Sequence, residues 1–410
     1  MAKKNNNIIA SLDIGTTKVC ALIAKLDSEG VIEIIGAGNI PFAALKKGAI
    51  VDLEKTINAI EEALRFAEER SDSSISSVYT NIGGNQIKGM NSRGVVAILR
   101  GDREITKVDI EKVIEHAKIS IPTDREVIHI LPKEYIVDDQ DGIKNPLGLS
   151  AMKLEADVYI ITSPASSVQN ISKSIDRSGY DINQFVFQTL ADSYAVLSPD
   201  EKDLGVVLVN IGGDSIDLAI FIDGSLCYID FIPIGGNTIT NDIAVVLGTP
   251  KKDAEKIKKQ FGCACTSLVT ETETIEVPNT NGKGFRTITR IELVEIIEAR
   301  VREICELIKN NICQNDLIYR IGSGIVITGG AANMEGIAKI AEEITKKSVR
   351  IGFPQGVRDL VNIVNDPIYS TSVGLILFGA EKQKENFTTL NRKSLDGIFG
   401  KLKNWWQETF

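Results

Sequence analysis

Residues 8–18 read IIASLDIGTTK: an apolar run ends at an aspartate and is followed by a turn that contains a glycine and two threonines. Two further apolar runs follow, VCALIAKL at 19–26 and VIEIIGAG at 31–38, which predicts three consecutive strands in a meander. Residues 204–234 repeat this design, with LGVVLV, the turn NIGGDSID, LAIFI, a DG turn and SLCYIDFIPI. A chain that repeats a whole unit of strands and turns is typical of a duplicated α/β fold.

Helical patterns accompany both meanders. Apolar residues recur at helical spacing in Leu53–Arg70, Ala165–Ser178, Lys251–Phe261 and Ile291–Ile312. Each half is therefore expected to be a mixed sheet covered by helices. The Thr-, Asn- and Gly-rich stretch TETETIEVPNTNGKGF indicates a strand and hairpin region inside the second half.

The expected organisation has two halves, one insertion in each, a polar linker and a terminal helix. The predicted segments are 1–85 with 160–195 and 366–380 for the first half, 86–159 for its inserted small subdomain, 196–247 with 292–365 for the second half, 248–291 for its insertion, 381–394 for a flexible linker, and 395–410 for an amphipathic helix.

Composition narrows the class of protein. At 410 residues, with 43% hydrophobic and 25% charged residues, the chain can bury more than one core. The net charge of −9 argues against nucleic-acid binding, because phosphate contacts need clustered Lys and Arg. The N-terminus does not resemble a signal peptide and no long apolar run is present, so we expect a cytosolic protein that does not span a membrane. The cysteines form no CxxC pair and the histidines lack metal-ligand spacing, so neither is expected to bind a metal.

The turn after the first strand carries groups that suit a phosphate. Gly15 allows a tight turn, Thr16 and Thr17 offer hydroxyl donors, and Lys18 can add positive charge. Asp13, at the strand end, suits contact with a hydrated Mg²⁺ ion. The alternative is a plain hairpin turn.

The second meander carries a matching turn. Asn210, Gly212, Gly213, Asp214 and Ser215 occupy the equivalent place. Two loops could hold one polyphosphate from opposite sides, which a pair of ordinary turns does not explain.

A third motif is IVITGGAANMEGI at 325–337, a buried strand followed by Gly329, Gly330 and Ala331 and then a helix. The glycines would let a nucleoside approach the backbone at a helix N-terminus. The alternative is a strand-to-helix turn. Neither a P-loop motif nor GxGxxG is present.

In this order the three motifs resemble those of the actin, heat-shock ATPase and sugar kinase superfamily. The resemblance implies an actin-like duplicated α/β ATPase fold whose two domains flank a cleft for ATP and Mg²⁺. It assigns Asp13–Lys18 and Asn210–Asp217 to phosphate, and Thr328–Ala331 to adenosine. Gln188–Leu197 and Asp366–Gly379 are similar to its two connecting helices.

Over nearly the whole chain the sequence resembles the FtsA family of bacterial cell-division proteins. The resemblance rests on LKKGAIVDLEKT, DGIKNPLGLSAMKLEADVYIIT, PIGGNTITNDIAVVLGTPKKDAEKIKKQFG, RIELVEIIEARVREI and the C-terminal tail. It implies that Gly235, Gly236, Glu255 and Lys258 line the cleft. It also implies self-assembly into a filament, binding to FtsZ and later division proteins, and a place at the division site on the cytoplasmic face of the membrane.

Two positions depart from the family pattern. Asn210 stands where the second phosphate loop usually begins with Asp, and Gln188 stands where the connecting segment often has Glu. Both changes remove a carboxylate that would orient Mg²⁺ or water, so we expect ATP binding with at most slow hydrolysis. The alternatives are a sugar or acetate-type kinase of the same superfamily, and a pilus-assembly or rod-shape homologue.

The tail reads as an amphipathic helix that follows a polar linker. Its apolar face consists of Leu395, Ile398, Phe399, Leu402, Trp405, Trp406 and Phe410. The aromatic residues and nearby lysines predict binding to anionic membrane lipid, and the alternative is packing on the chain's own domain. By resemblance, Gly248–Arg302 is the expected partner surface, where Arg286, Arg290 and Arg300 could offer charge to an acidic peptide.

Overall fold

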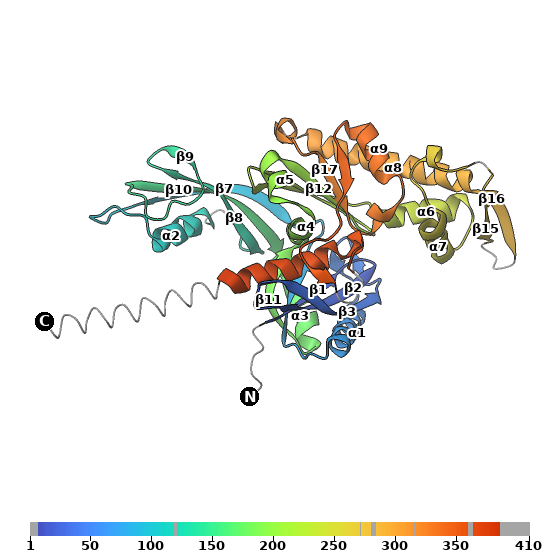
Figure 1. Ribbon diagram of the computed structural model, residues 1–410, viewed down its shortest axis with the longest axis horizontal. Helices are drawn as coiled ribbons and strands as arrows, with labels where there is room; N and C mark the ends of the chain where they lie inside the picture. The colour runs from blue at the N-terminus through green and yellow to red at the C-terminus, as the bar shows by residue number, and fades with distance from the viewer. Residues whose placement is uncertain are drawn as a thin grey trace.

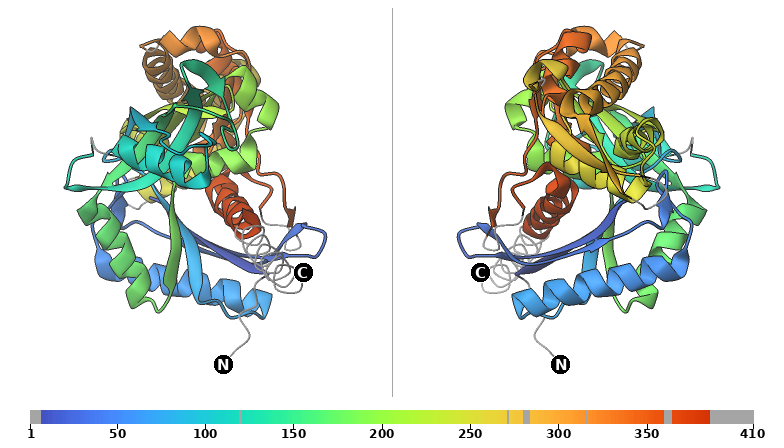
Figure 2. Two further views of the ribbon diagram at one scale, coloured as in Figure 1. Left: turned by 90° about the vertical axis from the view of Figure 1, so that its left-hand side faces the viewer. Right: turned by 90° about the vertical axis from the view of Figure 1, so that its right-hand side faces the viewer.

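The structure is a computed structural model that describes residues 7–118, 121–270, 272–279, 284–314, 316–359 and 364–385. Two helix-covered sheets face each other, and a smaller sheet extends to one side (Figures 1 and 2).

The first half is built on a six-stranded sheet in the order β11-β6-β1-β2-β3-β19. Its strands are β1 (Ile8–Ile14), β2 (Lys18–Leu26), β3 (Ile32–Pro41), β6 (Ser77–Ile82), β11 (Asp181–Phe187) and β19 (Arg358–Asp359). Helices α1 (Leu53–Ser71) and α3 (Ala165–Arg177) cover its outer face (Figure 1). α1 lies so close to β3 that a Cβ on Gly38 would fall 1.9 Å from the carbonyl oxygen of Ala63, so the glycine of β3 fixes this contact.

The second half repeats this arrangement, with a five-stranded sheet in the order β14-β13-β12-β17-β18. Its strands are β12 (Val206–Ile211), β13 (Ile216–Ile222), β14 (Ser225–Ile232), β17 (Ile325–Thr328) and β18 (Val349–Ile351). In both sheets the first strand pairs antiparallel with the next strand of the meander and parallel with a later strand. The predicted duplication and both meanders are confirmed.

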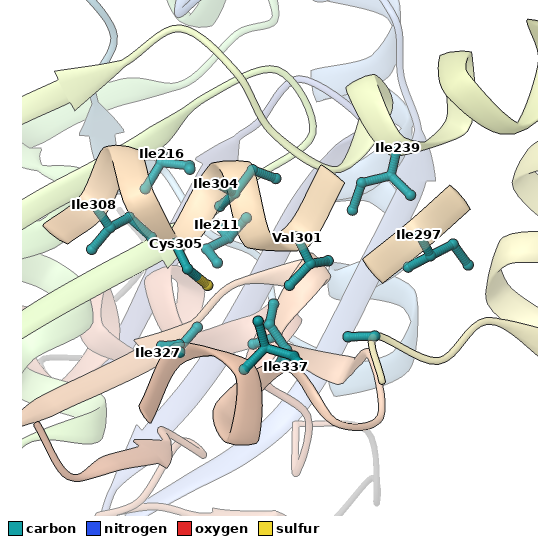
Figure 3. Close-up of a cluster of buried hydrophobic side chains, with 14 of the residues drawn as sticks. Ile211, Ile216, Ile239, Ile297, Val301, Ile304, Cys305, Ile308, Ile327 and Ile337 are labelled. Atoms are coloured by element: carbon teal, nitrogen blue, oxygen red, sulfur yellow. The ribbon is translucent and has the colours of Figure 1, made fainter. Parts of the chain in front are cut away.

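The outer face of the second sheet is covered by α6 (Gly236–Val246), α8 (Arg290–Cys313) and α9 (Ile337–Thr345). Figure 3 shows Val301, Ile304 and Cys305 of α8 directed toward the cluster that includes Ile216 and Ile327. These side chains are almost fully buried, which explains the apolar repeat of this long helix.

Two helices lie in the layer between the sheets. They are α4 (Gln188–Val196) and a helix that begins at residue 370, directly after the 3₁₀ turn η5 (Pro367–Tyr369), and continues through residue 385. They cross where a Cβ on Gly374 would fall 1.9 Å from the carbonyl oxygen of Ala191, so only glycine permits this approach. Because these helices connect the halves, their crossing sets the geometry of the cleft.

The small subdomain inserted in the first half is a four-stranded sheet in the order β7-β10-β8-β9, covered by α2. Its elements are β7 (Lys88–Ala97), α2 (Lys107–Ala117), β8 (Arg125–Val137), β9 (Gln140–Ile143) and β10 (Lys153–Pro164). It also touches the second half, since the Ile229 N–H donates to the Tyr159 hydroxyl over 3.0 Å.

The remaining elements are short. They are β4 (Leu45–Lys46), β5 (Ala49–Ile50), α5 (Pro199–Leu204), α7 (Lys251–Phe261), η2 (Thr266–Leu268), β15 (Thr274–Pro278), β16 (Phe285–Thr289), η3 (Asp316–Arg320) and η4 (Gly330–Asn333). The antiparallel pairing of β15 with β16 confirms the hairpin predicted in the second insertion.

Two details differ from the expectations. The helix from residue 370 runs through 385, whereas the linker was expected to begin at 381, and an ion pair between Lys382 and Glu385 lies in this last turn. Gly330 begins the 3₁₀ turn η4, and α9 begins only at Ile337, so the glycine pair does not start that helix directly. The other segment boundaries stay predictions, and the amphipathic segment 395–410 lies outside the described residues. In the part of the chain that the structure describes, no helix combines the length and the apolar character needed to cross a bilayer.

Candidate functional site

Two equivalent turns face each other at the centre of the molecule. We call residues 13–18 the first hairpin and residues 210–215 the second hairpin. In the first, the Gly15 N–H donates to the Lys18 carbonyl over 2.9 Å, and in the second the Gly212 N–H donates to the Ser215 carbonyl over 2.9 Å. A Cβ on Gly213 would lie 2.6 Å from Cγ2 of Thr17, so the hairpins approach to contact.

A cavity of about 460 Å³ lies between the hairpins, a volume typical of small-molecule sites. Most of the residues expected from the sequence line it: Asp13, Gly15, Thr16, Thr17, Lys18, Asn210, Gly212, Gly213, Ser215, Gly236, Glu255, Lys258, Gly329, Gly330 and Ala331. The structure thus brings residues from distant parts of the chain to one cleft.

Two expected residues, Asp214 and Gly235, do not line the cavity. Asp214 accepts a hydrogen bond of 2.7 Å from the Asn237 side chain. A Cβ on Gly235 would lie 2.6 Å from the carbonyl oxygen of Gly212. Asp214 is thus a residue of the second hairpin that is held by Asn237, and Gly235 packs directly against this hairpin.

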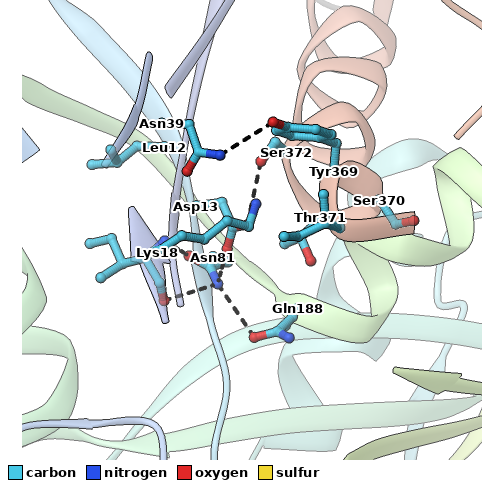
Figure 4. A network of polar contacts seen from close by, with 12 residues as sticks. Leu12, Asp13, Lys18, Asn39, Asn81, Gln188, Tyr369, Ser370, Thr371 and Ser372 are labelled. Carbon is cyan, nitrogen blue, oxygen red and sulfur yellow. Dashed lines mark hydrogen bonds and ion pairs between the residues drawn. The ribbon is translucent and has the colours of Figure 1, made fainter. Parts of the chain in front are cut away.

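In the first hairpin the charges are paired with each other. The Lys18 ammonium lies 3.1 Å from the Asp13 carboxylate and 4.9 Å from the centre of the Tyr369 ring (Figure 4). Burial alone would lower the pKa of Lys18. The neighbouring Cys20 and Asp13 favour the charged ammonium more strongly, so the net effect is a raised pKa. Lys18 therefore remains charged and its charge is largely neutralised by Asp13, so it is less available to a phosphate than the sequence indicated.

The carboxylate of Asp13 fits contact with a hydrated cation rather than full coordination. It accepts hydrogen bonds from Asn81 at 3.0 Å, Lys18 at 3.1 Å and Ser372 at 3.3 Å. A carboxylate offers roughly four acceptor positions, so about one remains for a metal-bound water. The role expected for Asp13, in which Mg²⁺ is held through water, stays a prediction.

Lys258 and Glu255 stand together on α7 at the other end of the cavity. The Lys258 ammonium lies 2.7 Å from Glu255 and donates to the Gly236 carbonyl over 3.0 Å. Burial lowers the pKa of Lys258 more than Glu255 raises it. Burial also tends to raise the pKa of Glu255, but hydrogen bonds from Lys258 and Thr240 outweigh it and leave that pKa below its usual range. Lys258 and Glu255 therefore form an ion pair with no net charge at this side of the cavity.

Sequence reasoning missed a third segment of the cleft, Asn81–Gly84, which consists of the last two residues of β6 and the two glycines after it. The available signal was the tetrapeptide NIGG, which occurs at 81–84 and again at 210–213. Its Gly84 N–H donates to Asp217 of the second half, which joins the two halves at the wall of the cavity. Burial raises the pKa of Asp217 to about 7.

Sequence reasoning also missed three consecutive hydroxyl groups at the start of the helix from residue 370. Ser370 contacts Thr328 at 2.6 Å, Thr371 donates to Asp192 over 2.7 Å, and Ser372 donates to Asp13 over 3.3 Å. Three side chains of one helical turn thus hold β17, α4 and β1 together.

The arginines expected to meet a partner are engaged within the chain. Arg286 donates to the Leu247 carbonyl. Arg290 pairs with Glu273 at 2.7 Å, and Arg300 pairs with Asp242 at 2.5 Å. Their role toward an acidic peptide stays a prediction, and a partner would have to compete with these contacts.

His129 belongs to the core. It is buried, its Nε2 accepts from the Phe187 N–H over 3.0 Å, and burial lowers its pKa to about 4. The neutral ring therefore joins the inserted subdomain to the start of α4.

Two matching sheets around a central cleft define the chain as an actin-like protein. Solved structures with this fold include the PilM–PilN type IV pilus biogenesis complex, with a TM-score of 0.67 and 14% identity over 91% of this chain and 98% of that chain. They also include MreB5 of Spiroplasma citri bound to ADP, with a TM-score of 0.58 and 15% identity over 93% of this chain and 98% of that one.

Sequence comparison gives the family. The family described as "Cell division protein FtsA" matches residues 207–374, and "SHS2 domain inserted in FTSA" matches residues 84–162. FtsA of Pseudomonas aeruginosa is 39% identical over 99% of both chains. FtsA of Escherichia coli K12 is 37% identical over 99% of both, and that of Borreliella burgdorferi is 38% identical over 98% of both. The chain belongs to the FtsA family of cell-division proteins.

Proposed function

We propose that the protein binds ATP with Mg²⁺ in the central cleft and links FtsZ filaments to the cytoplasmic face of the cell membrane at the division site. The observation that carries the nucleotide proposal is the cavity between the two hairpins. Backbone N–H groups of glycine-rich turns suit phosphate oxygens, and bound Mg²⁺ would neutralise phosphate charge. Membrane attachment through 395–410, contact with FtsZ and later division proteins, and polymerisation rest on the sequence and on membership of the family.

Isothermal titration with ATP and Mg²⁺ tests the cleft. A Cβ on Gly330 would meet nothing closer than 3.8 Å, so we expect Gly330→Glu to fold and to place a carboxylate at the cavity wall. We expect ATP affinity to fall at least tenfold, because the acid repels phosphate and fills nucleotide space.

Gly101→Glu is the matched control, because a Cβ on Gly101 meets nothing within 4 Å and the residue lies in the inserted subdomain. It should leave ATP affinity unchanged. Equal affinity in the wild type and Gly330→Glu contradicts the assignment of the cleft.

Co-pelleting with FtsZ and anionic lipid vesicles tests the link. Trp405→Glu with Phe399→Glu should release the protein from vesicles and leave ATP affinity unchanged, because apolar burial drives interfacial binding. Asn404→Glu with Gln407→Glu adds the same charge on the polar face and should weaken binding less. If both double variants pellet equally, the apolar face is not the anchor.

A further inference from the structure

Asn210 of the second hairpin and Asp192 of α4 form a buried pair behind the cavity wall. The Asn210 side-chain nitrogen donates to an Asp192 oxygen over 2.7 Å. Asp192 is fully buried and Asn210 is 4% exposed. Asp192 does not line the cavity, whereas Asn210 does.

This contact fixes the orientation of the amide. The NH₂ group of Asn210 is the part of the amide that faces Asp192, because it donates to a carboxyl oxygen that accepts the bond. The amide oxygen of Asn210 is then turned the other way, and it lies 2.3 Å from the place a Cβ on Gly329 would take. Gly329 has a φ of 89° and lines the same cavity. The amide oxygen therefore reaches the part of the wall formed by Thr328–Ala331, the stretch that the family resemblance assigns to adenosine.

Asp192 is itself held from a second side. Thr371, at the start of the helix from residue 370, donates to its other oxygen over 2.7 Å. The carboxylate therefore joins α4, β12 and this last helix, so its position depends on how the halves meet. Burial raises the pKa of Asp192 to about 7, against the two hydrogen bonds that favour the charged form.

We propose that Asp192 is a positioning residue of the nucleotide site: it holds the Asn210 amide with its oxygen toward the cleft and its NH₂ group away. This inference rests on the proposed nucleotide binding. The amide oxygen of Asn210 then offers the ligand a hydrogen-bond acceptor, while the carboxylate that orients the amide lies behind the cavity wall.

The test exchanges the two side chains. Asp192→Asn leaves two amides that can pair in either orientation, so ATP affinity with Mg²⁺ should fall about tenfold. Asn210→Asp places two carboxylates in hydrogen-bond contact, so the nucleotide-free protein should unfold at a lower temperature and bind ATP more weakly. The exchange variant Asp192→Asn/Asn210→Asp restores an amide–carboxylate bond. Both its unfolding midpoint and its ATP affinity should recover toward the wild type, in a strongly non-additive cycle.

Asp109→Asn is the matched control, since Asp109 is also buried and lies in the inserted subdomain, bonded to Thr106 over 2.7 Å. It should lower the unfolding midpoint without changing ATP affinity. If the exchange variant recovers its unfolding midpoint but not its ATP affinity, Asp192 is a purely structural residue and the inference is overturned. Additive effects of the two single substitutions on ATP affinity would overturn it as well. Absence of ATP binding in the wild type would instead overturn the proposed function.

Discussion

The first and second hairpins have the same backbone and different charges. Each is closed by a 2.9 Å hydrogen bond from its first glycine, and each follows the central strand of its sheet. In the first hairpin Asp13 stands opposite Cys20 and pairs with Lys18 of the same turn. In the second, Asn210 stands opposite Asp217, and the charges lie on Asp217 and on Asp192 behind it.

The two halves therefore share the backbone of this turn but differ in the charged groups around it. The first hairpin neutralises its own carboxylate, whereas the second depends on groups from other segments. Asp217 accepts from Gly84 of the first half, and Asn210 is held by α4. The second hairpin should therefore respond more strongly to relative motion of the halves.

Lys18→Met breaks the first hairpin's own pair and carries the largest expected effect. It leaves the Asp13 carboxylate buried without its counter-charge, which costs about 3–5 kcal/mol of folding free energy. Urea unfolding measures this cost. Lys25→Met, an exposed position on the same strand, should cost less than about 1 kcal/mol. A loss for Lys18→Met no greater than for Lys25→Met would mean that the pair is not structural.

Asp217 makes the second hairpin sensitive to pH. Its pKa rises from 3.8 to about 7 on folding, so between these values the folded state binds a proton that the unfolded state has lost. Stability from this group is complete at low pH and falls as pH rises through this window, by at most about 1.4 kcal/mol per pH unit.

Asp217→Asn should remove this component. We expect the stability of the wild type relative to Asp217→Asn to decrease steadily as pH rises from about 4 to 7, measured by urea unfolding. The exposed control Asp141→Asn should give a constant difference. An increase with pH for Asp217→Asn would show that its carboxylate is stabilised in the charged form.

The strands, the duplication and most of the cleft could be predicted, because local patterns encode them. Apolar alternation and glycine turns identify both meanders and both hairpins. The contacts of Lys18 with Tyr369, of Asp192 with Asn210, and of Gly84 with Asp217 could not be predicted in this way. Each joins segments that meet only after the sheets have packed, and no local pattern fixes which side chains then touch.

Gly213→Thr makes the second hairpin resemble the first at its fourth position, where the first hairpin has Thr16. The new Cβ would lie 2.6 Å from Cγ2 of Thr17, so the hairpins must separate, at a cost of about 1–3 kcal/mol and a loss of ATP affinity. Thr17→Ser removes that methyl group and should restore part of the stability of Gly213→Thr. No restoration would place the clash elsewhere.

The finest test asks whether the two turns are equivalent in energy as well as in shape. A Cβ on Gly15 would lie 3.3 Å from the Lys18 carbonyl oxygen, and one on Gly212 would lie 3.2 Å from that of Ser215. Neither glycine has a positive φ. Alanine therefore restricts the unfolded chain and stabilises the fold by about 0.4–1 kcal/mol in both cases, and it meets the same mild crowding. Gly15→Ala and Gly212→Ala should therefore change the unfolding free energy by less than about 1 kcal/mol and agree within about 0.5 kcal/mol. Gly213→Ala, one residue further on, should cost more than either because its Cβ meets Thr17. The expectation fails if the unfolding free energies of Gly15→Ala and Gly212→Ala differ by more than those of Gly213→Ala and Gly212→Ala. The two hairpins would then not be equivalent in energy.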